Sequence, residues 1–128
     1  MINRYDKNGN LIYSKDSDGT ERWYDKNGNK IHYKDSNGYE YWYEYDENNN
    51  KIHYKDSDGN EWWREYDDKG NEIYSKDSYG IERWREYDDK GNEVHYKSSG
   101  GYEVWCKYDD KGNLIHYKDC NGYEQWKE

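Results

Sequence analysis

The chain repeats one pattern of about 21 residues, and each copy carries two glycines ten residues apart. The shared pattern is Y-D-x-x-G-N-x-[IV]-x-x-K-x-x-x-G-x-E-x-W. One copy has Asn49 at the first glycine, and Asn is the residue that best replaces glycine at a positive φ. The copies begin at Tyr5, Tyr24, Tyr45, Tyr66, Tyr87 and Tyr108. We therefore expect residues 1–128 to form a single repeat domain.

Both glycines end sequences that are typical of reverse turns. Asp6-Lys7-Asn8-Gly9 and Asp16-Ser17-Asp18-Gly19 place Asp first and Gly last, as a type I turn prefers. The segments between turns are rich in Tyr, Trp, Ile and Val and are too short for helices. Such tight connections make sequential strands antiparallel neighbours. The sequence predicts an all-β fold, an antiparallel up-and-down meander of about twelve short strands.

The odd period constrains the strand register, because side chains alternate between the two faces of a strand. To keep one residue type on one face, we expect a three-residue loop at the second turn and an even loop at the first. This register sets Lys15 opposite Glu21, and so on to Lys118 opposite Glu124. The other register would set Asp16 opposite Glu21, which is unfavourable.

The same register aligns the repeat tryptophans with Tyr or His in an aromatic row across the sheet. Its members are Tyr13, Trp23, His32, Trp42, His53, Trp63, Tyr74, Trp84, His95, Trp105, His116 and Trp126. Each repeat has essentially one aliphatic residue: Ile12, Ile31, Ile52, Ile73, Val94 and Ile115. We therefore expect a thin, twisted or curled sheet held by aromatic pairs, without a thick core. Its edge strands could pair into a homodimer.

Composition limits the possible partners. The net charge of −9 disfavours nucleic acid and anionic membranes and favours a basic protein partner. No stretch has the apolar length of a signal peptide or a membrane span, so we expect a cytoplasmic protein. Cys106 and Cys120 lie at unrelated repeat positions, which leaves a disulfide between them open.

The titratable residues recur periodically and do not converge on one site. His32, His53, His95 and His116 share one repeat position, so they should form a row with roughly 10 Å spacing and no metal site. The Asp-Asn turns carry oxygen ligands suited to calcium, but Leu11 stands where an EF-hand loop needs glycine. Turn capping explains these acids. We expect no cofactor and no enzymatic activity, because a catalytic site needs one asymmetric constellation.

Positions that vary between repeats are free to carry recognition. They flank the repeat tryptophan and share one face. Tyr, Trp and Arg are the side chains that most often anchor interfaces. The partner-binding patch predicted on this basis consists of Tyr41, Tyr43, Trp62, Arg64, Arg83 and Arg85. Solvated surface is the alternative explanation for the same residues. Aromatic rows also stack on sugar rings, so a carbohydrate-binding or cell-surface module is an alternative function.

With Y-D-D-K-G-N-L at Tyr108 to Leu114 and a second turn ten residues later, nearly the whole chain resembles the tyrosine-aspartate (YD) repeats of RHS-type proteins. The chain departs from them at Asn10 and its equivalents, where the family often carries Arg, and in its repeated Trp. The resemblance implies structural, non-catalytic repeats like those that form a shell around a toxin segment.

By analogy with small proteins of polymorphic toxin systems, we expect an acidic immunity protein that binds a basic toxin domain, such as a nuclease. A fragment of an RHS shell is a further alternative.

Overall fold

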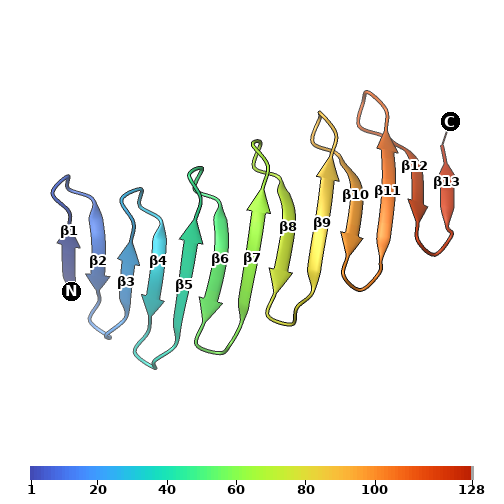
Figure 1. Ribbon diagram of the computed structural model, residues 1–128. Coiled ribbons are helices and arrows are strands. Elements are labelled where there is room, and N and C mark those ends of the chain that lie inside the picture. Colours follow the sequence, from blue (N-terminus) through green and yellow to red (C-terminus); the bar gives the residue numbers. More distant parts are fainter. Residues whose placement is uncertain (128) are drawn as a thin grey trace. The chain divides into compact units, whose positions relative to one another are not determined.

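The computed structural model describes residues 1–127, and all regular structure in this range is β-strand (Figure 1). The first strands are β1 (Ile2–Tyr5), β2 (Leu11–Lys15), β3 (Glu21–Tyr24), β4 (Lys30–Lys34), β5 (Glu40–Tyr45), β6 (Lys51–Asp56) and β7 (Glu61–Tyr66). They are followed by β8 (Glu72–Asp77), β9 (Glu82–Tyr87), β10 (Glu93–Ser98), β11 (Glu103–Tyr108), β12 (Leu114–Asp119) and β13 (Glu124–Trp126).

Strand order in the sheet is the order of the chain, which confirms the up-and-down meander. The chain divides into two compact units, Met1–Trp63 and a second that begins at Arg64. Within each unit the paired strands are antiparallel. There are thirteen strands instead of about twelve, because residues 2–5 ahead of the first turn form a strand of their own.

Both kinds of turn have the same geometry. In the first turn Asp6 N–H donates to Asn10 O at 2.9 Å and Gly9 N–H donates to Asp6 O at 3.1 Å. In the second turn the same pair of bonds joins Asp16 to Thr20 and to Gly19, at 3.0 and 3.1 Å. The closing glycines have positive φ, and Asn49 takes φ 65° at the equivalent place. The predicted Asp-to-Gly turns are confirmed, but the even loop predicted for the first turn is wrong.

The odd period comes from a β-bulge that follows the first turn in the five hairpins whose register is described. Across β3 and β4, Tyr24 pairs with Lys30 but Trp23 pairs with His32, so Ile31 has no partner in register. The same shift skips the aliphatic residue in four other hairpins: Ile12, Ile52, Val94 and Ile115. One extra residue on one strand reverses the alternation of faces. The Ile or Val that follows the first turn of each of these repeats is therefore the residue that corrects the register.

The predicted opposition of Lys and Glu is confirmed, since Lys15 pairs with Glu21 and Lys118 with Glu124. Among the described ring contacts, the predicted aromatic row is continuous only from β2 to β5. There the ring centroids of Tyr13, Trp23, His32 and Trp42 follow one another at 5.3, 4.1 and 4.9 Å.

Later strands carry two extra residues between Trp and the turn, and this slides Trp away from the next ring. Trp42 then pairs with Lys55 and Trp105 with Lys118. From β6 onward the described contacts therefore consist of separate pairs within single hairpins: His53–Trp63, Tyr74–Trp84, His95–Trp105 and His116–Trp126.

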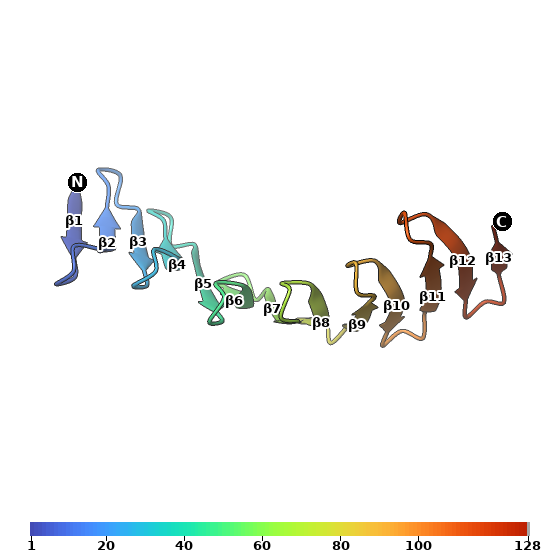
Figure 2. The same ribbon diagram turned by 90° about the horizontal axis from the view of Figure 1, so that it is seen from above.

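Within each unit the strands form a single layer, and no other described part of the same unit covers either face (Figure 2). No apolar side chain among the described residues is buried, as the thin aliphatic inventory predicts. The buried residues are Thr20, Asp56 and His116, all polar. Stability must therefore come from cross-strand pairs and backbone hydrogen bonds.

Cys106 and Cys120 are both free thiols in the structure. In the described range there is no helix of the length and apolarity that a membrane crossing requires. Over the same range no group of three or more His, Cys, Asp or Glu side chains is placed to hold a metal ion.

Candidate functional site

The first half of the predicted partner-binding patch lies within a packed group of rings. Tyr41 stacks on Tyr33 with centroids 4.8 Å apart and planes 12° from parallel, and Tyr43 contacts Tyr41 edge-on at 5.3 Å. Trp62 stacks on Tyr54 at 5.7 Å. All three predicted residues are half-buried. These variable side chains thus already stabilise the sheet. Only the edges of their rings are available to a partner.

The second half of that patch consists of arginines that are paired with acids. Arg64 Nε lies 3.1 Å from Glu72 Oε1, and Arg85 contacts Oε2 of the same carboxylate. Arg85 also lies 5.2 Å from the ring centroid of Tyr96. Arg83 is 3.9 Å from Asp77. The guanidinium charges are therefore largely balanced within the sheet, and the patch stays a prediction.

The opposite face repeats a three-residue arrangement of Glu, His or Tyr, and Trp. His53 Nε2 bonds to Glu61 Oε2 at 2.7 Å while its ring stacks on Trp63 at 16°. Where Tyr replaces His, as at Tyr74, the hydroxyl donates to Glu82 at 2.7 Å and the ring tilts. The Glu that lies opposite Lys in the strand register is thus also hydrogen-bonded to the His or Tyr side chain of the preceding strand.

His95 lies between two carboxylates. Its Nε2 is 2.7 Å from Glu103 Oε2, and its Nδ1 is 3.4 Å from Glu86 Oε1. The bond to Glu103 raises the pKa of His95, and Glu86 adds to this against the opposing effect of burial. Two carboxylates on the two ring nitrogens favour the imidazolium, which alone can donate to both.

Asp56 is the acid that the fold holds most firmly. Its carboxylate accepts hydrogen bonds from Tyr54 OH at 2.7 Å, Tyr39 OH at 3.1 Å and Asn60 Nδ2 at 3.0 Å. Burial opposes its ionisation, but these bonds outweigh the effect and lower its pKa to about 2. The cluster joins β6 to the turns that precede β5 and β7 through side chains alone.

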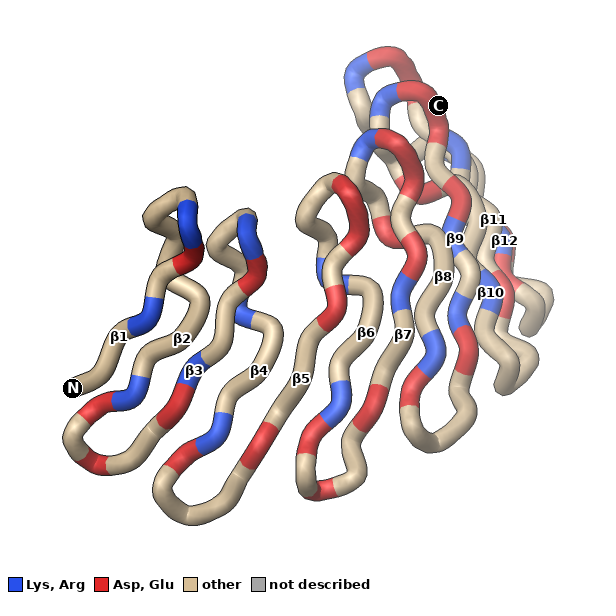
Figure 3. Tube along the Cα trace, turned by 60° about the vertical axis from the view of Figure 1, so that its left-hand side comes forward, with Lys and Arg blue, Asp and Glu red and all other residues tan. Residues whose placement is uncertain are grey.

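Acidic residues gather at the turns, along the rims of the sheet in each unit (Figure 3). The aspartates that begin the first turns accept backbone N–H bonds, as Asp6 does from Asn8 and Asn10 at 2.9 Å. These bonds lower the pKa of Asp6, with the backbone bond from Asn10 as the main cause. The negative charge is therefore fixed on the rims, while the strand faces carry acids and bases together.

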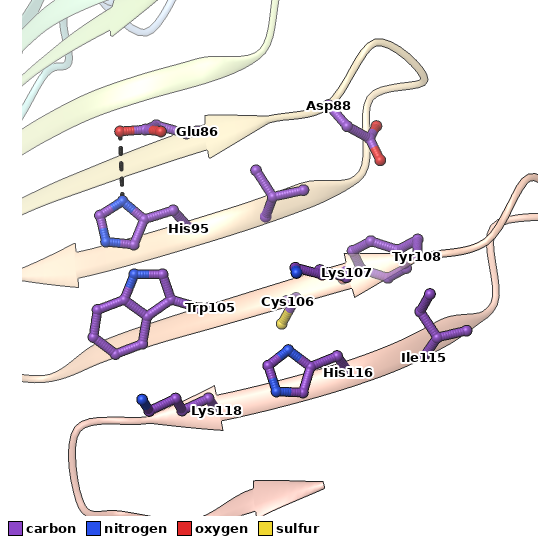
Figure 4. A pocket seen from close by; sticks show the side chains of 11 residues that line it. Glu86, Asp88, His95, Trp105, Cys106, Lys107, Tyr108, Ile115, His116 and Lys118 are labelled. Carbon is purple, nitrogen blue, oxygen red and sulfur yellow. Dashed lines mark hydrogen bonds and ion pairs between the residues drawn. The ribbon is translucent and has the colours of Figure 1, made fainter. Parts of the chain in front are cut away.

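The second unit contains a hollow of about 760 Å³ on the Trp-bearing face, over β9 to β12 (Figure 4). Its floor and walls include Trp105, Lys107, His116 and Lys118. Trp105 is 39% exposed. Cys106 borders the hollow from β11, but its side chain alternates with Trp105 and Lys107 and so lies on the opposite face. Burial raises the pKa of this thiol, so it stays protonated at neutral pH.

Sequence reasoning did not assign this hollow as a site. A signal was present, because Glu-Val-Trp-Cys-Lys-Tyr at 103–108 departs from Glu-Tyr-Trp-Tyr-Glu-Tyr at 40–45. Lys107 lies on the Trp-bearing face and reverses the charge of Glu44 and Glu86 at the equivalent positions. Only the register shows that this change lies beside Trp105 and His116.

No protein-family model and no curated protein matches the chain. Solved structures do. The TcdB2-TccC3-TEV structure has a TM-score of 0.64 at 12% identity over 91% of this chain and 7% of that chain. The TcdB2-TccC3-Cdc42 structure has a TM-score of 0.62 at 16% identity over 98% of this chain and 9% of that one.

A third structure, TcdB2-TccC3 without its hypervariable C-terminal region, has a TM-score of 0.62 at 17% identity, over 98% of this chain and 9% of that one. This chain thus spans less than a tenth of each of the three chains that it matches. At these identities the likeness shows the fold alone, and it supports the RHS-type repeat fold expected from the sequence.

Proposed function

We propose that this chain is a structural, non-enzymatic wall segment of an RHS-type shell. The observation that carries the proposal is the match of 91–98% of the chain to short stretches of much larger chains. A wall segment needs a sheet that can be extended by further repeats. The meander provides this, because each hairpin pairs with its neighbours in the chain and every described repeat uses the same turn geometry.

The arrangement of titratable groups supports a structural role. The Glu and His or Tyr side chains on the Trp-bearing face hydrogen-bond each other in every repeat, as in Tyr13–Glu21 and His116–Glu124. A side chain repeated in six copies serves the sheet, whereas catalysis needs one site with unlike members. The Glu and the His or Tyr of each repeat therefore form their hydrogen bonds within the sheet.

An acidic immunity protein in the cytoplasm is a second candidate, favoured by the net charge of −9 and the acidic rims. Such a protein would bind a basic toxin domain through electrostatic attraction. The rim aspartates weaken this candidate, since their carboxylates are already occupied by backbone N–H groups. The arginines of the predicted patch are paired with acids and would add little attraction.

The mass of the native polypeptide separates the two functions. An antibody raised against this chain is used to probe extracts of the source cells after denaturing electrophoresis. The wall-segment proposal predicts a band several times heavier than 15.8 kDa, because the segment is built into a longer repeat protein. A single band at the mass of this chain would contradict the proposal and favour the second candidate.

A further inference from the structure

Four side chains in the hollow of the second unit form a square across β11 and β12. Trp105 pairs with Lys118, and Lys107 pairs with His116. The two rings therefore lie on one diagonal and the two ammonium groups on the other. His95 stacks on Trp105 from β10 at 5.6 Å, and Trp126 stacks on His116 from β13 at 3.6 Å. Each ring of the diagonal is thus covered on its outer side.

Trp105 on β11 and His116 on β12 both line the hollow, which extends over β9 to β12 (Figure 4). The described residues place no third ring between Trp105 and His116. Val94 and Ile115 add apolar lining. A flat ring can enter beside the indole with its plane roughly parallel to it, which is the offset stacking that aromatic pairs favour.

The charge of the square is unlike that of its counterparts. On β5 and β6 the same square consists of Trp42, Glu44, His53 and Lys55. On β9 and β10 it consists of Trp84, Glu86, His95 and Lys97. In both, the Glu lies beside the second nitrogen of the His, at 3.5 and 3.4 Å, and balances the Lys.

Lys107 replaces that Glu on β11, so the square itself carries two ammonium groups and no carboxylate, and the acids that line the hollow, Glu86 and Asp88, lie on and just after β9. Neither Lys107 nor Lys118 has an acid within 4 Å among the described residues, and His116 has its bond to Glu124 only through Nε2. A carboxylate placed between the ammonium groups would meet two cations next to apolar walls, where charge pairs are stronger than in bulk water.

We propose that this hollow binds a small planar aromatic carboxylate. Its ring lies against Trp105 and His116, and its carboxylate lies between Lys107 and Lys118. The hollow of about 760 Å³ is within the range of small-molecule sites. This site is independent of the wall-segment proposal, since a structural repeat does not require a ligand.

The test compares indole-3-acetate with its neutral analogue indole-3-acetamide, using ¹⁵N-resolved NMR of the full chain. The Trp105 Nε1–H signal is assigned from a Trp105→Phe variant. We expect saturable shifts of this signal with indole-3-acetate at a Kd on the order of 1 mM, and at least about tenfold weaker binding of the amide.

Lys107→Glu recreates the square found at His53 and His95, so the variant should fold. We expect it to weaken indole-3-acetate binding about tenfold or more, whereas the matched change Lys97→Glu, beside Trp84, leaves it unaltered. Equal binding of acid and amide, unaltered binding by Lys107→Glu, or equal shifts at every Trp would overturn the proposal.

Discussion

The aspartate that begins each second turn has the same backbone role in most repeats, but its side-chain contacts differ. Asp35 accepts bonds from the backbone of Asn37 and Tyr39. Asp56 accepts the equivalent bonds from the backbone of Asp58 and Asn60. It also accepts bonds from Tyr39 OH and Tyr54 OH. The extra bonds explain why Asp56 is buried while Asp35 is not.

Replacing Asp56 by Asn should therefore lower the urea midpoint of unfolding more than the matched change Asp35→Asn. The lowered pKa of Asp56 means that its carboxylate stabilises the fold fully above the ordinary value of 3.8 and loses this effect as pH falls through about 2. The difference between wild type and Asp56→Asn should shrink over that acid range. Equal midpoints for the two variants at pH 7 would contradict the role assigned to the tyrosine hydroxyls.

His95 gives a second pH dependence, of the opposite sign. Its raised pKa means that the imidazolium stabilises the fold fully below pH 6.5 and loses this effect as pH rises through the higher, folded-state pKa. His95→Tyr retains a hydrogen-bond donor to Glu103, as Tyr13 and Tyr74 do to their own Glu. Relative to this variant, wild type should lose about 0.5 kcal/mol of unfolding free energy between pH 5.5 and 8.5, as a half-exposed ion pair would. Parallel pH curves would refute the assignment.

Among the elements, the hairpin with its bulge is the part that sequence reasoning described least well. The odd period correctly required two connections of unlike parity, and the opposition of Lys15 and Glu21 followed from it. A loop with an even number of residues and a three-residue loop with one bulge place the following side chains on the same faces. The alternation of side chains therefore could not distinguish these two connections. The Asp-to-Gly pattern, identical in both turns, was the evidence for identical loops.

Deleting one bulge residue should be far more damaging than deleting two strand residues. Removal of Ile52 exchanges the faces of every later side chain in the hairpin and should abolish cooperative unfolding. Removal of Tyr43 and Glu44 together leaves Trp-Tyr-Asp, as in Trp23-Tyr24-Asp25, and should keep both the β-type circular dichroism and a cooperative transition. Similar unfolding curves for the two deletions would contradict the register role of the bulge.

For the molecule as a whole, the fold class could be predicted because six copies of one pattern repeat the same local signals. The contacts of the variable residues could not be predicted. Tyr41 and Arg85 vary between repeats, yet both are engaged within the sheet. The charge of the hollow depends on one residue that departs from the repeat pattern, Lys107, and the strand register sets its neighbours. The repeated positions identify the residues that build the sheet. The strand register is needed to show which of the variable residues lie next to one another.

The first strand has exposed residues throughout, so association through an edge is expected when charge repulsion is screened. With a net charge of −9, raising NaCl from about 20 mM to about 500 mM should increase the mass measured by light scattering. Asn3→Pro removes a backbone donor from β1 and should reduce this increase. A mass independent of salt would show that this edge does not pair under these conditions.

The bulge at the Ile or Val that follows the first turn is the central structural claim, and interstrand NMR contacts between β9 and β10 test it most directly. The structure predicts backbone NOEs that join Tyr87 to Glu93 and Glu86 to His95, with Val94 skipped. NOEs that join Glu86 to Val94 in a continuous register would contradict it.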